Sequence, residues 1–242
     1  MKKDLREKDD AVSPVIALML ILAILATCLA VYTTTYVPGL KQQDEITHTG
    51  EVKLAFERFA ADIDNTIALG KPAVYTEVLE LGGGDVPLSP TKSSGTIEIN
   101  TSKIGTYKIG DGSEQELNGI EISYLPSFTA WEKQGYVYKN GVVWITKEEK
   151  MTPAALKLYT IQDGLNSTNE TIKTWASPTD PVIIPQFSVK ENFSEITGTS
   201  AVKLRLNATL SDTHTSITVT PIGETARTYT NVRFLNIEVS VE

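Results

Sequence analysis

The sequence predicts an α+β protein in which one long N-terminal helix, over about residues 14–68, precedes a mainly antiparallel β domain. Three observations support this fold class. Residues 11–40 contain no charged side chain, and apolar side chains then recur at helical spacing as far as residue 67. From residue 73 onward, short runs rich in Val, Ile, Thr and Tyr alternate with Gly, Pro and Asn, which is typical of strands and turns.

The first part of the predicted helix, residues 11–37, is long and apolar enough to cross a membrane. As a helix these residues would extend roughly 40 Å, whereas the hydrocarbon core of a bilayer is roughly 30 Å thick. Basic residues keep their side of a span in the cytoplasm, and four of them precede this segment: Lys2, Lys3, Arg6 and Lys8. The sequence therefore predicts a single-pass membrane protein whose C-terminal part lies outside the cell.

This apolar run differs from a cleaved secretory signal. It is longer than such a signal requires, and the small residues around Cys28 lie inside the run rather than after it. Two alternatives remain open. The run is either a signal anchor that stays attached to its N-terminal tail, or part of a signal that is cut before the run, so that the run stays on the mature protein.

A second helical part, residues 38–70, is predicted to form an amphipathic stem. Pro38-Gly39 allows a kink at its start, and Gly70 marks its end. Its apolar positions are separated by three or four residues, with one adjacent pair, and lie on one face. They are Val52, Phe56, Phe59, Ala60, Ile63 and Ile67. We expect this face to pack on a sheet.

The remaining residues, 71–242, are predicted to form a β-rich extracellular domain. The clearest hairpin spans 136–145, because Asn140-Gly141 suits a two-residue turn with positive φ. Other expected strands cover 74–81, 96–100, 120–124, 201–210, 216–221 and 232–241. A short helix is expected over 152–162, and a polar surface excursion over 164–185.

Composition excludes several classes of function. The chain has 242 residues and a net charge of −8, and its basic residues are scattered, so nucleic acid is not a predicted partner. Cys28 is the only cysteine, which excludes an intramolecular disulfide. Asn-x-Ser/Thr sequons, which are possible N-glycosylation sites, occur at Asn100, Asn166, Asn169, Asn192 and Asn207.

No catalytic or metal-binding pattern stands out in the sequence. The two histidines, His48 and His214, have no neighbouring ligands at metal-binding spacing, and we expect both to be solvated loop residues. No Gly-x-Ser-x-Gly nucleophile motif is present. The sequence thus predicts neither an enzyme, nor a cofactor, nor a metal site.

The N-terminal stretch KDDAVSPVIALMLILAILAT resembles the N-terminal motif of archaeal type IV pilins, which carry a class III signal peptide. The resemblance implies that residues 1–10 are a leader, removed by a prepilin peptidase between Asp10 and Ala11. Two positions depart from common patterns. Asp10 is acidic where a basic residue is commonest, and Val15 stands where bacterial pilins carry a glutamate. Ser13-Pro14 also suits the start of any helix.

The resemblance further implies a filament in which copies of the helix bundle together, built by pilus assembly machinery from this chain or related pilins. The helix positions expected to face neighbouring copies are Val15, Ala17, Ile21, Ala23, Ala26 and Ala30. Adhesion at the cell surface is the expected role. The alternative is a single-span, membrane-anchored surface protein with a β-rich ligand-binding domain.

Overall fold

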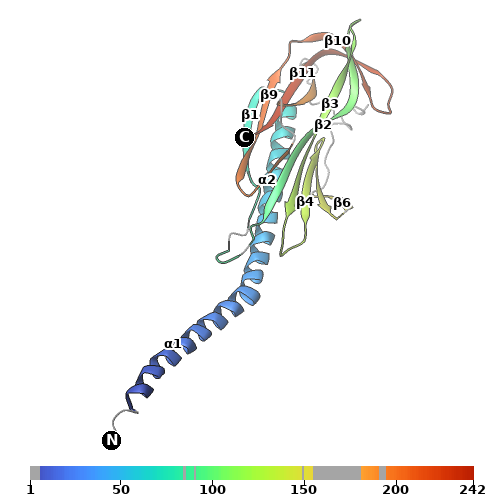
Figure 1. Cartoon of the computed structure of the whole chain (residues 1–242). Coiled ribbons are helices and arrows are strands. Elements are labelled where there is room, and N and C mark those ends of the chain that lie inside the picture. The colour runs from blue at the N-terminus through green and yellow to red at the C-terminus, as the bar shows by residue number, and fades with distance from the viewer. Residues whose placement is uncertain (1–5, 84–85, 90, 149, 155–180, 191–194) are drawn as a thin grey trace.

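The computed structural model describes residues 6–242 except 84–85, 90, 149, 155–180 and 191–194. A long helix leads from the N-terminus into a β-sheet domain, as the sequence predicts (Figure 1). The helix comprises α1 (Arg6–Val31), a π-helical turn η1 (Tyr32–Tyr36) and α2 (Val37–Leu69). Gly70 ends it in the left-handed conformation with φ 57°, and its N–H donates to the carbonyl oxygens of Thr66 and Ile67.

The irregular turn, η1, lies directly before the kink that was predicted at Pro38-Gly39. Those two residues are regular α-helix, whereas η1 occupies the turn before them. Proline has no N–H, and its ring crowds the carbonyl group four residues earlier, here that of Thr34. The distortion therefore falls on the preceding turn, and the helix changes direction in this region (Figure 1).

Eleven strands follow the helix in the part of the chain that the structure describes. In chain order they are β1 (Ala73–Glu80), β2 (Ser94–Ile109), β3 (Glu114–Ser127), β4 (Gln134–Lys139), β5 (Val142–Lys147), β6 (Lys150–Pro153), β7 (Val182–Val189), β8 (Glu195–Gly198), β9 (Ala201–Leu210), β10 (His214–Pro221) and β11 (Arg227–Val241). They form one sheet in the order β1-β9-β11-β10-β2-β3-β4-β5-β6. Two strands lie off this path: β7 pairs with β11, and β8 pairs with β2. The β7–β11 pair is parallel, and all the other pairs between described strands, including β8–β2, are antiparallel.

The sheet curls around α2, which contacts β1 near one sheet edge and β4 and β5 near the other (Figure 1). Every member of the predicted apolar stripe is buried, and Ile63 is completely inaccessible to solvent. Aromatic rings complete this core: Phe56 and Tyr136 have ring centroids 6.1 Å apart, and Phe59 meets Tyr138 edge-on at 6.5 Å. One face of α2 therefore packs against strands near both edges of the sheet.

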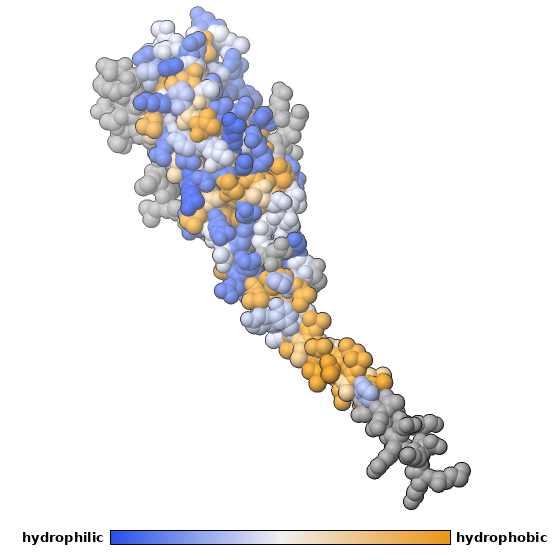
Figure 2. Space-filling view, turned by 90° about the vertical axis from the view of Figure 1, so that its left-hand side faces the viewer, coloured by the Kyte–Doolittle hydropathy of each residue, from blue (hydrophilic) through white to orange (hydrophobic). Residues whose placement is uncertain are grey.

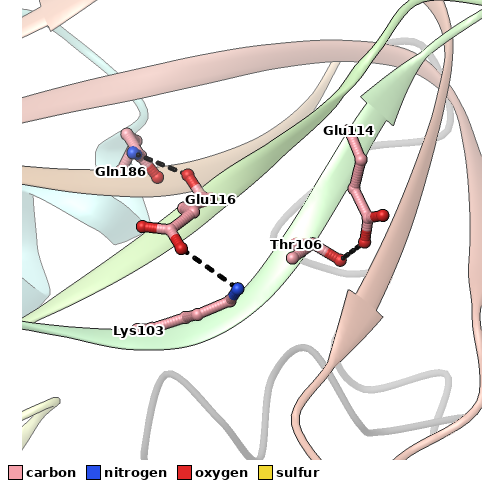
Figure 3. A network of polar contacts seen from close by, with 5 residues as sticks. All are labelled: Lys103, Thr106, Glu114, Glu116 and Gln186. Atoms are coloured by element: carbon pink, nitrogen blue, oxygen red, sulfur yellow. Dashed lines mark hydrogen bonds and ion pairs between the residues drawn. The ribbon is translucent and has the colours of Figure 1, made fainter.

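β7 lies between β11 and β3. It pairs with β11 through backbone hydrogen bonds, whereas the side chain of Gln186 connects it to β3. The Gln186 amide accepts a hydrogen bond from the N–H of Asn118 at 3.1 Å and donates to the carbonyl oxygen of Glu116 at 3.2 Å. Figure 3 shows Gln186 beside Glu116, whose carboxylate pairs with Lys103 across the β2–β3 ladder. The Gln186 side chain thus joins β7 to β3.

Two predictions, the helix over 152–162 and the surface excursion over 164–185, require correction. Thr152 and Pro153 end β6 instead of starting a helix, and the rest of the predicted helix 152–162 lies outside the described residues apart from Ala154. Residues 182–185 were predicted as part of a surface excursion, but they begin strand β7. The strand preference of Val182, Ile183 and Ile184 is stronger here than the turn preference of the prolines on either side. The Asn140-Gly141 turn is as predicted, with φ of 46° and 97°.

Candidate assembly helix and its docking to the sheet domain

The N-terminal helix exposes its apolar side chains on all sides. Its large hydrophobic residues from Val15 to Val31 are each between 50% and 65% exposed. The residues predicted to face neighbouring copies, Val15, Ala17, Ile21, Ala23, Ala26 and Ala30, are all exposed as well. Figure 2 shows a continuous hydrophobic stalk below the more polar domain. Such a surface is unfavourable in water and needs lipid or other protein around it.

Three threonines in this segment donate their hydroxyl groups to carbonyl oxygens of the same helix. Thr27 Oγ1 donates to the carbonyl oxygens of Ala23 at 3.0 Å and Ile24 at 2.8 Å, and Thr33 and Thr34 make equivalent bonds one to two turns later. Tyr32 and Tyr36 lie at the C-terminal end of this apolar segment with ring centroids 5.6 Å apart. Of the described helices, this is the one long and apolar enough to cross a membrane, which suggests membrane anchoring.

Above Tyr36 the helix docks to the sheet domain, first through polar and then through apolar contacts. The polar part is a buried stripe of three ionisable residues, Lys41, Glu45 and His48, which we call the polar latch. Lys41 is 4% exposed, and its ammonium group donates to the carbonyl oxygen and the hydroxyl of Thr91, both at 2.7 Å. The latch thus holds the β1–β2 loop against the helix.

Glu45 is fully buried, and its carboxylate accepts hydrogen bonds from three residues on two loops. These are Ser93 Oγ at 2.5 Å, the Thr129 N–H at 3.0 Å and the Ala130 N–H at 2.9 Å. Burial by itself disfavours the charged form, but the hydrogen bonds to the carboxylate together outweigh burial and lower the pKa of Glu45. The carboxylate therefore stays ionised and ties the β3–β4 loop to the helix.

His48 bridges the helix to β3. Its Nε2 lies 3.0 Å from Tyr124 Oη, which in turn donates to the carbonyl oxygen of Leu81 at 2.9 Å. Tyr124 has one hydroxyl hydrogen and gives it to Leu81, so the imidazole Nε2 is the donor to Tyr124. Burial lowers the pKa of His48 despite nearby Glu51, Asp44 and Glu80, which favours the neutral ring.

The structure corrects the expectation that both histidines are solvated loop residues. His48 is 4% exposed inside α2, and His214 starts β10, half-buried with its ring 5.9 Å from Phe234. The sequence did carry a signal for His48. The apolar stripe continues backward from Val52 in steps of 4, 3, 4 and 4 residues, at His48, Glu45, Lys41 and Val37, all of which are buried. Three of these four residues are ionisable, so a pattern of apolar side chains alone does not reveal the continuation.

The predicted sequons occupy different environments. Asn100 is exposed on β2, where its Nδ2 donates to Glu98 Oε1 at 2.7 Å. Asn207 is half-buried in β9, between Val74 of β1 and Glu238 of β11. Asn166, Asn169 and Asn192 lie outside the described residues. The predicted cleavage point between Asp10 and Ala11 falls within α1.

Within the described part of the chain, no group of three or more His, Cys, Asp or Glu residues is placed to hold a metal ion. No protein-family model, curated protein or solved structure matches this chain.

Proposed function

We propose that this chain is a type IV pilin-like subunit that assembles through α1 into a cell-surface filament. The observation that carries the proposal is the combination of two environments in one helix. Residues 15–31 are apolar and exposed on every side, whereas one face of the same helix, from Val52 to Ile67, is buried in the core of the sheet domain. A subunit of this kind moves from lipid into a bundle of identical helices without refolding.

The continuity of the helix supports a role in transmitting mechanical force. α1, η1 and α2 follow one another without a break, and α2 is held by polar contacts near its start and apolar contacts along the rest. Force on the outer domain would therefore reach the helix bundle through buried contacts. Adhesion follows as the proposed role, with the outer β domain presented to the surroundings. The proposal assigns no reaction and no cofactor to the chain.

Processing distinguishes this proposal from a membrane anchor that never assembles. A prepilin peptidase would remove residues 1–10, and pilus assembly machinery would then extract the subunit with Ala11 at its new N-terminus. The test is intact-mass and N-terminal peptide analysis of the protein purified from its native membranes. A chain starting at Ala11 supports the pilin-like function, and a chain starting at Met1 overturns it in favour of a single-span surface protein.

A further inference from the structure

The helix α2 is held to the sheet domain in two different ways along its length. From Val52 onward, its buried apolar side chains belong to the hydrophobic core. The lower part, Val37–Thr49, contributes no side chain to that core and is held mainly by the polar latch. Gly50, an exposed residue that weakens a helix relative to alanine, lies between the two parts. Opening of the latch therefore does not require the apolar core to unfold.

His48 lies at the upper end of the latch, enclosed by segments of the sheet domain. The Phe128 ring, directly after β3, lies edge-on with its centroid 5.9 Å from that of the imidazole. Gly83, in the β1–β2 loop, packs against the ring so closely that a Cβ there would lie 2.9 Å from Cβ and Cγ of His48. Tyr124 of β3 accepts from Nε2 at 3.0 Å. The imidazole is therefore in contact with the same two loops that the other latch residues hold.

A proton added to this imidazole would place a positive charge where little can stabilise it. The side chain is buried, and Tyr124, which faces it from β3, is uncharged. The carboxylates that attract a charge on the ring are Asp44 and Glu51 of α2 and Glu80 of β1. Among the described residues, none of these carboxylates forms an ion pair with the ring. The loss of hydration on burial therefore outweighs their attraction and lowers the pKa of His48.

The docked and undocked forms of the lower helix therefore differ in their affinity for a proton. In the undocked form the ring of His48 is hydrated and has its ordinary pKa of 6.5, whereas in the docked form the pKa is lower. Above pH 6.5 neither form takes up the proton. As the pH falls from that value through the lowered pKa, the undocked form binds the proton preferentially, and the docking equilibrium constant decreases by up to about tenfold per pH unit. The carboxyl group of Glu45 titrates only below its ordinary value of 4.5, so it does not contribute in this range.

We propose that His48 is an acid-sensitive switch in the polar latch: protonation of its imidazole releases the lower part of α2 from the β1–β2 and β3–β4 loops while the apolar core stays folded. The proton comes from solvent and binds Nδ1, because Nε2 already carries the hydrogen that is donated to Tyr124. Release of the two loops leaves the orientation of the sheet domain relative to α1 less constrained in acid. The proposal does not depend on whether α1 assembles into a filament.

The test is amide hydrogen exchange of the detergent-solubilised full chain from about pH 7.5 to about pH 5, corrected for the pH dependence of the intrinsic exchange rate. The reporters are the N–H groups of Thr129 and Ala130, which donate to Glu45. Leu206 of β9 and Ile237 of β11, inside the sheet, report on unfolding of the whole domain. We expect the two reporters to be less protected than the two core amides at every pH, and their protection to fall below pH 6.5 by up to about tenfold per unit. Protection equal to that of the core, or independent of pH, overturns the proposal.

Two histidine variants assign the change to one residue. His48→Gln keeps an amide hydrogen for Tyr124 but has no group that titrates, so the protection of the two reporters should no longer depend on pH in this range. His214→Gln, at the other histidine of the chain, should behave as the native protein does. Asp64 of α2 titrates in the same range, because desolvation raises its pKa to about 6, but a raised pKa stabilises the folded state in acid and has the opposite sign. An unchanged pH dependence in His48→Gln overturns the proposal.

A direct measurement on the ring decides the question even if the His48→Gln chain does not fold. In the His214→Gln chain, His48 is the only histidine, so NMR of the carbon-13-labelled imidazole follows its titration alone. We expect a midpoint below pH 6.5, in the range where the reporters lose protection. A midpoint at or above pH 6.5 overturns the proposal, because protonation would then not oppose docking.

Discussion

His48 on the stem helix and Tyr124 on β3 lie 3.0 Å apart, Nε2 to Oη, at the level where α2 enters the sheet. The tyrosine also donates to the Leu81 carbonyl oxygen just after β1, so one hydroxyl joins the helix to two strands, β3 and β1, that lie five places apart in the sheet order. Together with Glu45 and Lys41, this bond fixes the sheet domain relative to the helix that emerges below it. The orientation of the domain thus depends on buried polar groups.

Removing the hydroxyl with Tyr124→Phe should lower the free energy of unfolding by about 1–3 kcal/mol, because the His48 N–H and the Leu81 carbonyl group both lose a buried partner. The measurement is chemical denaturation of the detergent-solubilised full chain. Tyr107→Phe is the matched control, since its hydroxyl bonds to Gln115 at an exposed position. Equal effects of the two variants would show that the Tyr124 bridge has no special role.

Stability should fall in acid as Glu45 becomes protonated. The pKa of this carboxyl is lowered in the folded state, so its contribution is complete above the ordinary value of 4.5. As the pH falls from that value through the lowered pKa of the folded state, the contribution is lost. Denaturation curves measured across this range should show the decline in the native chain.

Glu45→Gln should flatten this acid dependence and lower the free energy of unfolding at neutral pH by about 2–4 kcal/mol, because an amide cannot accept from all the buried donors. Glu224→Gln, at an exposed turn, should change neither quantity. The same acid slope in the Glu45→Gln and native chains would contradict the assignment.

Two glycine-to-alanine changes should have opposite signs. A Cβ on Gly95 would lie 2.4 Å from the Leu81 carbonyl oxygen and 2.4 Å from the Tyr124 ring, so Gly95→Ala should cost about 1–3 kcal/mol of stability through overpacking. Gly50 lies on the exposed face of α2 with open space around it, and Gly50→Ala should add about 0.5–1 kcal/mol. Thermal unfolding of the two variants in parallel checks the pair, and a destabilising Gly50→Ala would indicate that this face is covered.

Assembly should depend on the apolar character of α1. Ile21→Asp places a charge in the middle of the exposed apolar segment, where burial in lipid or among neighbouring helices is expensive, and should abolish filaments. Ile222→Asp changes an equally exposed apolar residue on the sheet domain and should leave filament yield unchanged. Electron microscopy of cells expressing each variant provides the measurement, and normal filaments from Ile21→Asp would refute assembly through α1.

Much of the architecture was predictable from local patterns. Residues 11–40 lack charge, and the stripe from Val52 to Ile67 repeats at helical spacing, so the exposed apolar helix and its buried continuation follow from periodicity alone. The Asn140-Gly141 turn follows from the positive φ that those two residues tolerate. Each of these features is determined within a few residues of chain, which is the range over which sequence patterns are informative.

The polar latch and the place of β7 were decided only by the tertiary structure. Glu45 finds Ser93 48 residues away and Ala130 85 residues away, and β7 reaches β3 through Gln186 and Asn118, 68 residues apart. A charged residue on a helix is ordinarily solvated, and it becomes a buried anchor only when distant loops bring donors to it. Local sequence determined which surfaces this protein presents, and long-range hydrogen bonding determined how the domain is held above its helix.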